Sequence, residues 1–556
     1  METLRKIPKI YWLLFLTALI GGINIFYNYG IVTGGSDETL VINSALKFFR
    51  DFSLADKYGT LLPGVIILYI PFIALTLATY LFLGLGNISQ LNELVIVDTY
   101  KFAPYFRLVT VIFGIIVVYI FYKICLEIFK KQRPSLIASY LVATSLIFVQ
   151  QIHLAGAWIA QTMMILISVY YSLILLKKQK WHILDFLISA LLIVFSFEIE
   201  MVGLIAIVPF LLICWQKRKD MKVSQWIINL ILFFLLIILG VIFFAYLNPV
   251  TFRLYLSIFD NANQLGLSQT VYGRGLWGRI LDPFWILVLL EPLLFSLALL
   301  GMIIACKKNK FLWKFFGLYI VFYYLVLGPL LGGVFERRLL PIIPALACFA
   351  AVFIDFLIDR YDFGRVKKII YFSLLIFLIN PVVFDAVFLK KGTVVETRKW
   401  INENIPANAA IFDECRINLG KNKEILQTVF QNYPIFFTTR DRYLLDHPES
   451  DSSQKKYFLV DNDELVNLVN MVGRDKFQYL VFCYYNNYDK SDREKFLNPF
   501  LQRGKTKIYD YPANNKYPFL SYIFHLIRFN NYDNFGILAL WRLPVYGPHF
   551  EIFKFK

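Results

Sequence analysis

Residues 10–38 read IYWLLFLTALIGGINIFYNYGIVTGGSDE, a long apolar run followed closely by two adjacent acids, Asp37 and Glu38. The apolar part is long enough to cross a bilayer, because about 20 helical residues span the hydrocarbon core. Three basic residues precede it, and no small-residue cleavage site follows it. The run therefore predicts a retained membrane helix rather than a removable signal peptide.

Similar apolar runs recur along most of the chain. Of its 556 residues, 58% are hydrophobic and only 17% are charged, whereas about a quarter of a soluble globular protein is charged. This composition predicts a polytopic α-helical membrane protein. Eleven segments are predicted to span, namely 10–29, 105–125, 135–150, 158–176, 183–197, 200–216, 225–247, 283–305, 314–332, 339–357 and 369–388.

A further apolar run, 61–84, decides the sidedness of everything that follows it. If it does not span, the predicted cytoplasmic segments hold 22 Lys and Arg, and the short external segments hold 9. If it spans, five of the six basic clusters move outside, against the positive-inside tendency. We therefore expect 61–84, which contains Pro63 and Pro71, to be re-entrant or interfacial.

The net charge of +17 has the same explanation, because most Lys and Arg lie in short clusters between apolar runs. This distribution marks cytoplasmic loops and does not predict a nucleic-acid partner. The expected location is the plasma (inner) membrane, with membrane lipids as neighbours.

Residues 390–556 differ in composition from the part before them. Long apolar runs stop, and "VVETRKWINENIPANAAIFDEC" reads as a helix, a Pro turn and a strand. "DNDELVNLVNMVGRDKFQYLVFCYY" repeats the helix-then-strand order, and "FGILALWRL" reads as a further strand. The sequence thus predicts a transmembrane domain over 1–389 and an extracytoplasmic α/β domain over 390–556.

The cysteines and histidines give little sign of a metal site. No CxxC or Cys/His ligand spacing occurs, and no metal set can be built around His153. His153 is a candidate substrate-binding residue as a polar group beside the site, although a lone His is more often structural. We expect no metal or other cofactor, although a divalent metal is not excluded. Cys415 and Cys483 lie in the polar C-terminal region, and the sequence leaves their pairing open.

The adjacent acids have two readings. After Ser36, Asp37 and Glu38 open a stretch with helical apolar spacing, so that Ser36 can cap a helix and the acids can favour its dipole. The same two carboxylates, placed just outside a membrane helix, could instead act on a substrate. Composition alone does not choose between a structural and a functional role.

Several stretches, in order along the chain, resemble GT-C glycosyltransferases of the protein O-mannosyltransferase and aminoarabinose-transferase groups (glycosyltransferase family 39-like). "SDETLVINSALKFFRDFSL" resembles their first external loop. The later matches are "PYFRLVTVIFGIIVVYIFYKI" with Arg107, "NPVTFRLYL", "FERRLLPIIPALACFAA" with Arg338, and "TRKWINENIPANAAIF" at the start of the external domain. The resemblance covers most of the chain.

This resemblance implies transfer of a hexosyl or pentosyl group, with inversion, from a polyprenyl-phosphate sugar donor to a lipid, glycan or protein acceptor. By that resemblance Asp37 is the expected general base, and Glu38 orients it. Arg107, Lys57 and Arg338 are the expected phosphate partners, since guanidinium groups give two-point contact with phosphate oxygens. Arg107 and Arg338 also lie at helix ends, where an Arg can simply extend to the interface.

Two departures affect the substrate contacts. "KYGTLLPG" stands where close relatives carry a Lys-Pro-Pro stretch, keeping only Lys57 and Pro63. "FSFEIEMVG" stands where many relatives carry a Lys, so Glu198 and Glu200 are expected to contact substrate differently. Acids this near hydrocarbon are costly and favour a functional reading, although a turn could expose both to water.

Two other classes of function stay open at this point. A transporter or flippase of lipid-linked sugars would explain the helices and the intramembrane acids, but not the ordered loop motifs. A non-catalytic membrane protein that presents its external domain to a partner would explain the domain order. The role of Asp37 in turnover separates an enzyme from both.

Overall fold

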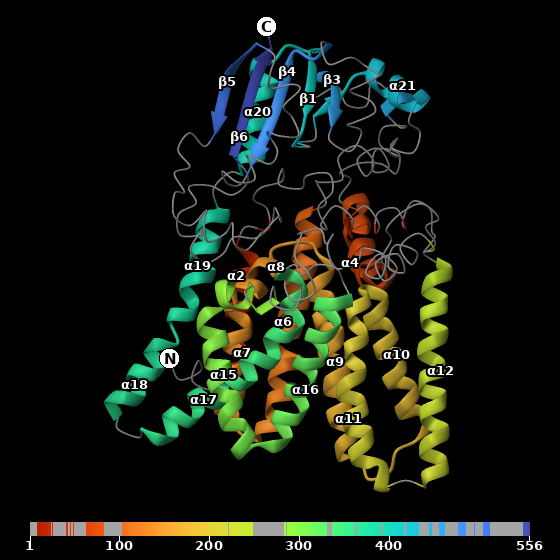
Figure 1. Cartoon of the computed structure of the whole chain (residues 1–556), viewed down its shortest axis with the longest axis vertical. Coiled ribbons are helices and arrows are strands. Elements are labelled where there is room, and N and C mark those ends of the chain that lie inside the picture. Colours follow the sequence, from red (N-terminus) through yellow and green to blue (C-terminus); the bar gives the residue numbers. More distant parts are fainter. Residues whose placement is uncertain are drawn as a thin grey trace. The chain divides into compact units, whose positions relative to one another are not determined.

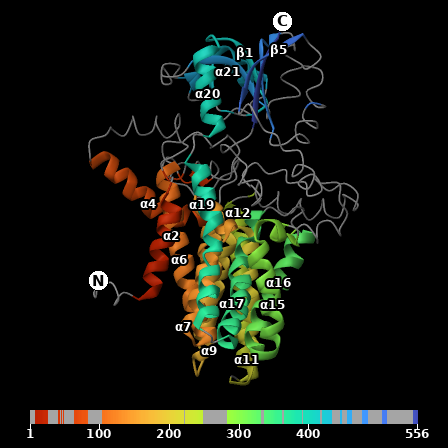
Figure 2. The same cartoon turned by 90° about the vertical axis from the view of Figure 1, so that its left-hand side faces the viewer.

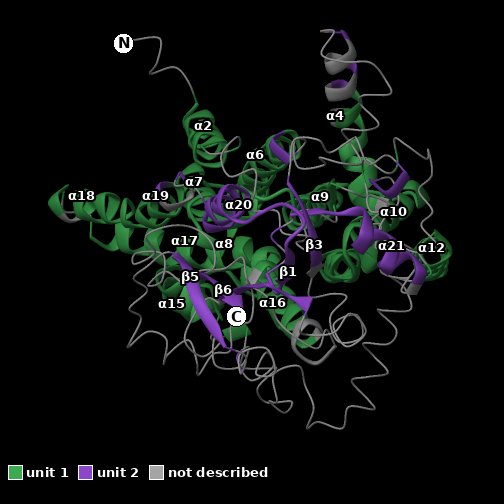
Figure 3. Cartoon of the chain, turned by 90° about the horizontal axis from the view of Figure 1, so that it is seen from above, with its two compact units in different colours: residues 1–25, 40–74, 105–385 green, residues 26–39, 75–104, 386–556 purple. Residues whose placement is uncertain are grey.

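The computed structural model describes residues 8–23, 25, 41–42, 45, 48, 63–82, 103–220, 222–247, 249, 283–284, 286–330, 336–361, 364–389, 392–415, 417, 419–432, 444–446, 455–461, 476–484, 494, 504–511 and 549–555. The chain divides into two compact units (Figure 3). The first comprises residues 1–25, 40–74 and 105–385. The second comprises residues 26–39, 75–104 and 386–556. The sequence placed one boundary after residue 389, whereas the units change after Asp385 and the second also includes two earlier segments.

The first unit is a bundle of apolar helices (Figures 1 and 2). Its described helices are α2 (Lys9–Gly22), α4 (Pro63–Phe82), α6 (Ala103–Phe129), α7 (Gln132–Ala143), α8 (Leu146–Ile152), α9 (Ala157–Lys177), α10 (Ile183–Ile199), α11 (Ile207–Lys217), α12 (Val223–Leu247), α15 (Pro292–Lys308), α16 (Lys310–Leu330), α17 (Ile343–Arg360), α18 (Gly364–Ser373) and α19 (Ile376–Phe388). The part of α4 after residue 74, the first two residues of α6 and the last three of α19 are assigned to the second unit. Short 3-10 segments add η2 (Met201–Ala206), η3 (Arg218–Asp220) and η4 (Glu336–Ile342).

Six of the described helical stretches are long and apolar enough to cross a membrane. They are 103–129, 157–177, 201–220, 223–247, 337–360 and 367–386. A seventh results if α7 and α8, which bend by 59° at their junction, count as one span. The chain is therefore a multi-pass helical membrane protein, as the sequence predicted.

Several predicted spans are interrupted helices rather than continuous ones. The predicted span 135–150 breaks between α7 and α8, and 200–216 begins with the 3-10 turns of η2. η2 can turn tightly here because Gly203 has no side chain. A Cβ at this position would lie 2.2 Å from the carbonyl oxygen of Ser196. Within 283–305, residues 283–284 and 286–290 are helical, the helix breaks at Glu291, and α15 begins at Pro292. The predicted span 369–388 falls across α18 and α19. Hydropathy reports length and apolarity, and it does not report where a helix breaks.

The helices differ in how far they face the bundle interior. Of the apolar windows of α9 and α17, 72% is buried, whereas only 22% of that of α12 is buried. α15 and α17 approach closely at Gly301, where a Cβ would lie 1.8 Å from the carbonyl oxygen of Phe349. Small residues let helix backbones meet in membranes. α9, α15 and α17 thus belong to the packed part of the bundle, and α12 presents an apolar surface suited to lipid.

Basic turns gather at one end of this bundle. Nζ of Lys177, at the end of α9, lies 2.5 Å from Oε2 of Glu127 near the end of α6. Arg133, at the start of α7, donates to Asp355 near the end of α17 at 2.5 Å. These residues come from, or lie beside, three of the clusters that the sequence assigned to one side of the membrane. We call this the basic end.

The second unit contains a six-stranded mixed sheet with the order β2-β3-β1-β4-β6-β5. Its elements are α20 (Thr393–Asn404), β1 (Ala410–Asp413), β2 (Gly420–Lys421), α21 (Lys423–Asn432), β3 (Lys456–Asp461), β4 (Tyr479–Tyr484), β5 (Lys505–Tyr511) and β6 (His549–Phe555). β1, β2, β3 and β4 pair in parallel, while β6 runs antiparallel to β4 and β5. This is the predicted α/β domain.

One face of the sheet packs on α20. Val394 and Ile401 of α20 join a buried core with Ile411, Val481 and Ile552. Alternation along each strand places these strand residues on the same face. The core explains why the helix-then-strand pattern after residue 392 folds as a domain.

A disulfide joins Cys415, just after β1, to Cys483 of β4, with the two Cα atoms 5.8 Å apart. The sequence left this pairing open. The predicted first helix and the strands at β1 and β4 are present, whereas the predicted strand in "FGILALWRL" lies outside the described residues.

Candidate functional site

α4 links two parts of the bundle that carry predicted site residues. The Tyr69 ring stacks on Phe106 with centroids 5.2 Å apart, and its hydroxyl shares a 2.7 Å hydrogen bond with Oγ1 of Thr110. Near the start of α4, a Cβ on Gly64 would lie 2.8 Å from the backbone of Glu198. Only a glycine allows this approach. The first two turns of α4 therefore contact both the end of α10 and the start of α6.

The end of α2 packs against α6 and α8. Near the end of α2, a Cβ on Gly21 would lie 3.0 Å from Cδ1 of Ile152, and one on Gly114 of α6 would lie 2.3 Å from the same atom. Ile152 closes α8, so α2, α6 and α8 meet there. In Figure 2, α4 lies oblique to the long helices rather than alongside them. This is the geometry expected of a segment that does not carry the chain across; its relation to a membrane stays a prediction.

We call the end of the bundle where α10 ends and α6 begins the site end. Glu198 is its most unusual acid. Its side chain is buried, with 7% of the residue exposed, and within the described residues neither carboxylate oxygen has a hydrogen-bond partner. Burying a carboxylate without partners costs several kcal/mol, roughly, and favours the neutral form or a bound ligand. Glu200 is only partly buried. The alternative in which a turn exposes both acids to water therefore does not hold for Glu198.

Arg107 is 1% exposed in the first turns of α6. An Arg that extends to the interface keeps its charged head in water, and this side chain does not. A buried guanidinium must be matched by acceptors or negative charge. Its burial beside Phe106, which stacks on Tyr69, places it at the same end as Glu198.

Arg338 lies in η4, between α16 and α17. The Tyr323 hydroxyl of α16 donates to the Arg338 carbonyl, and the Tyr319 hydroxyl donates to the Pro341 carbonyl at 3.2 Å. α9 packs against η2, which begins just after Glu200, and against η4, which carries Arg338. The fold thus places Arg338 and Glu200, which lie more than a hundred positions apart in the sequence, on elements that pack on the same helix.

His153 pairs with an acid that the sequence reasoning missed. Its Nε2 lies 2.9 Å from Oδ1 of Asp385 on α19, and its Nδ1 lies 2.7 Å from the Val149 carbonyl. Because a carbonyl only accepts, Nδ1 carries a hydrogen. A further proton between Nε2 and Oδ1 keeps two lone pairs from meeting, and the buried pair then has no net charge. His153 is a paired polar residue, and Asp385 could not be found from sequence because no spacing links it to His153.

Three of the predicted site residues lie outside the described part of the chain: Asp37, Glu38 and Lys57. The structure therefore neither brings them to Arg107 nor separates them from it. Their roles stay predictions. The described site end consists of Arg107, His153 with Asp385, Glu198, Glu200 and Arg338.

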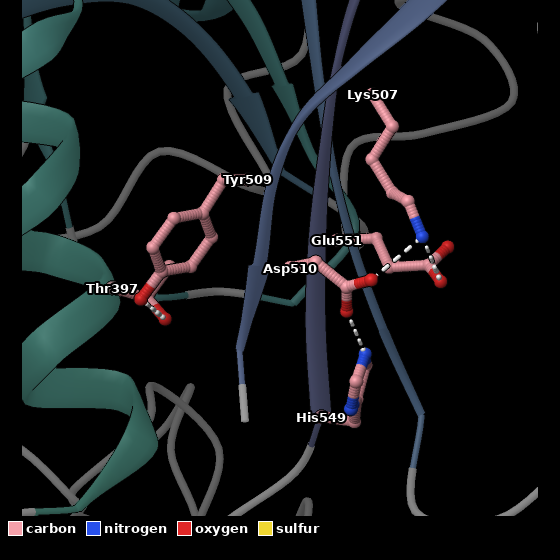
Figure 4. Close-up of polar contacts among 6 residues, drawn as sticks. All are labelled: Thr397, Lys507, Tyr509, Asp510, His549 and Glu551. Carbon is pink, nitrogen blue, oxygen red and sulfur yellow. Dashed lines mark hydrogen bonds and ion pairs between the residues drawn. The ribbon is translucent and has the colours of Figure 1, made fainter. Parts of the chain in front are cut away.

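A second polar cluster lies on β5 and β6 in the other unit (Figure 4). Oδ1 of Asp510 lies 2.6 Å from Nε2 of His549, and Nζ of Lys507 lies 2.7 Å from Asp510 and 3.4 Å from Glu551. Tyr509 points the other way and meets Thr397 of α20 (Figure 4).

Asp510, His549 and Glu551 are close enough to share a metal ion, as are Glu414, Cys415 and Cys483. Neither group is a good candidate for a metal centre. The Lys507 ammonium already pairs with both carboxylates of the first group, so a metal would have to displace it. In the second group both sulfurs are held in the disulfide. The sequence reasoning did not find the first group, because strand pairing across β5 and β6 creates it.

No protein-family model matches the sequence, and a comparison with curated proteins finds no match. Two similar solved structures are of ArnT from Cupriavidus metallidurans. The one bound to undecaprenyl phosphate is 10% identical, with a TM-score of 0.43, and the match covers 90% of this chain and 96% of that one. The apo structure is 10% identical, with a TM-score of 0.42, and covers 89% and 95%. The similarity extends over nearly the whole of each chain.

Proposed function

We propose that this protein is an integral membrane glycosyltransferase that uses a polyprenyl-phosphate-linked sugar as donor. One observation carries the proposal. A buried acid, Glu198, and a buried cation, Arg107, lie at the same end of an apolar bundle, linked by α4. Acids and cations inside membrane proteins are costly, and they typically mark a substrate path.

The reaction needs a general base for the acceptor hydroxyl and a cationic site for the leaving phosphate. The acceptor hydroxyl attacks the anomeric carbon while the bond to the lipid phosphate breaks, and this single displacement inverts the configuration. Asp37 takes the proton of the hydroxyl, a contribution of about 10²–10⁴-fold, and Glu38 orients it. Arg107, Arg338 and Lys57 balance the phosphate charge as it leaves.

Glu198 and Glu200 suit the sugar or the acceptor rather than the phosphate. Carboxylates accept hydrogen bonds from hydroxyl groups and repel an anion. Glu198 has acceptor capacity that the described residues do not use. A hydroxyl-rich ligand would supply the missing donors. The acceptor class is a lipid, a glycan or a protein.

The orientation follows from the charge distribution. The basic end is cytoplasmic by the positive-inside tendency, which makes the site end and the C-terminal domain extracytoplasmic. The disulfide between Cys415 and Cys483 agrees with this, because disulfides persist in oxidising compartments. We therefore assign the plasma (inner) membrane, with transfer at its outer face.

Asp37→Asn provides the test. Asparagine keeps the shape of the side chain but cannot accept a proton at neutral pH. In detergent or nanodiscs, with a panel of polyprenyl-phosphate sugars, turnover should fall by about 10²–10⁴-fold while donor binding is largely kept. Near-normal transfer by the variant would remove the catalytic role of Asp37. Lipid movement across the bilayer without any transfer would identify a transporter instead.

A further inference from the structure

Specific side-chain contacts fix the break between α7 and α8. The two helices bend by 59°, and Ser145 begins α8 as its N-cap, with Oγ accepting from the Phe148 N–H at 3.4 Å. A helix that starts inside a bundle exposes N–H groups that need acceptors. At membrane depth water does not supply them. Another part of the chain must therefore complete the cap.

Glu291 completes it. Its Oε1 accepts from the Ser145 hydroxyl at 2.6 Å and from the Ile147 N–H at 2.9 Å. Glu291 is 5% exposed and directly precedes Pro292, the first residue of α15. Negative charge at a helix N-terminus is favourable. The acid thus fixes the start of α8 from a different helix.

The other end of α8 is fixed as well. Ile152 lies between Gly21 and Gly114, and His153, the next residue, lies against Asp385 of α19. Between these two anchors α8 packs on η4, the segment that carries Arg338. A seven-residue helix held at both ends has little freedom, so its position determines how η4 is supported.

We propose that Glu291 is a positioning residue, which holds α8 against η4 and thereby holds Arg338 in place for a polyprenyl phosphate. The inference rests on the proposed function for its ligand, but its structural half stands independently. If Glu291 only stabilises the bundle, its loss lowers stability without a specific effect on α8 or on lipid binding. If it positions α8, both α8 and the lipid site change.

Three variants separate these readings in the full-length protein. Glu291→Ala leaves the start of α8 without its acceptor. Glu291→Gln keeps an amide oxygen that can accept from both Ser145 and Ile147, so it should rescue. Ser145→Ala removes the hydroxyl that donates to Glu291 and accepts from the Phe148 N–H, but it keeps Glu291 as the acceptor for Ile147. It serves if Glu291→Ala does not fold. Asp185→Asn is the matched control, because Asp185 is a buried cap of α10 that pairs with Lys178 at the basic end.

The first measurement is hydrogen–deuterium exchange without ligand. Amides 146–152 should exchange about tenfold faster in Glu291→Ala, and less so in Ser145→Ala. They should stay at the native rate in Glu291→Gln and Asp185→Asn. Unchanged exchange of these amides in both Glu291→Ala and Ser145→Ala would overturn the positioning role.

The second measurement is the Kd of undecaprenyl phosphate. It should rise about tenfold in Glu291→Ala and stay within about threefold of the native value in Glu291→Gln and Asp185→Asn. Faster exchange with an unchanged Kd would overturn the link to Arg338. Failure of the native protein to bind the lipid at all would overturn the proposed function, while the exchange result still decides the role of Glu291 in the fold.

Discussion

Replacing Glu198 by glutamine should make the protein more stable and less active. Glu198 is 7% exposed, and neither carboxylate oxygen has a hydrogen-bond partner in the described part of the chain. The bundle therefore holds a carboxyl group whose burial nothing described compensates. Glutamine has the same length and shape, and it removes the charge.

The size of the gain follows from this lack of partners. An unsatisfied buried polar group costs about 1–3 kcal/mol, and a charged one costs more. The amide of glutamine is also unsatisfied, so the gain is what folding costs for an ionisable group alone, whether its charge is buried or a proton is taken up to remove it, about 1–3 kcal/mol. For a domain of roughly 150–250 residues, each kcal/mol corresponds to about 2–4 °C in Tm, and a larger bundle shifts less.

Thermal unfolding in detergent and transfer from polyprenyl-phosphate sugars measure the two effects. Tm should rise, while transfer should fall by about tenfold or more, because a carboxylate that accepts from a sugar or acceptor hydroxyl is lost. Asp185→Asn is the contrast. Asp185 pairs with Lys178 at 2.6 Å and caps α10, so the same chemical change should lower Tm and leave transfer unaffected.

Two results would refute this reasoning. A lower Tm for Glu198→Gln would mean that the carboxylate is compensated and stabilises the bundle. A higher Tm with unchanged transfer would mean that Glu198 is buried but has no part in binding. Only a gain in stability together with a loss of activity fits an acid kept for a substrate.

The remaining predictions concern charge and sidedness. Arg107→Ala should weaken undecaprenyl phosphate binding by about 2–5 kcal/mol and Arg107→Lys by less, measured as Kd; an unchanged Kd would contradict the phosphate role. Single cysteines at Asn87 and at Gly156 should both react with an impermeant thiol reagent from outside, and labelling of the first only from inside would refute the topology. Burial opposes ionisation of Asp510, but the Lys507 hydrogen bond and the His549 charge outweigh it and lower the pKa of Asp510. The C-terminal domain should therefore lose stability as pH falls below about 4, and Lys507→Met should reduce that loss in acid unfolding curves; identical curves would show that the cluster does not couple to folding.

Composition and hydropathy were enough to predict the class of fold. Recurrent apolar runs determine a multi-pass helical protein, since each must leave water and satisfy its own backbone. The change of composition after residue 389 determined a second, α/β domain, because period and turn residues are local properties. The basic clusters predicted which turns belong together, and contacts such as Lys177 with Glu127 join two of them at the basic end.

Candidate residues were predictable one at a time, and their partners were not. Glu198 was conspicuous because an acid beside hydrocarbon is rare. Its burial depends on Gly64 and the close approach of α4, which no local pattern reports. Arg107 likewise had two readings until the structure buried it.

Only the tertiary structure showed which polar side chains and cysteines pair with one another. His153 with Asp385, Ser145 with Glu291, and Cys415 with Cys483 each join residues far apart in the chain. The break between α7 and α8 is also tertiary, since its cap is completed from the start of α15. The sequence determines which groups must be satisfied, because each side chain carries its own charge and hydrogen-bonding capacity. Which group satisfies them depends on helix packing, and helix packing depends on steric contacts, such as those at Gly21, Gly64 and Gly301, that arise only once the helices meet.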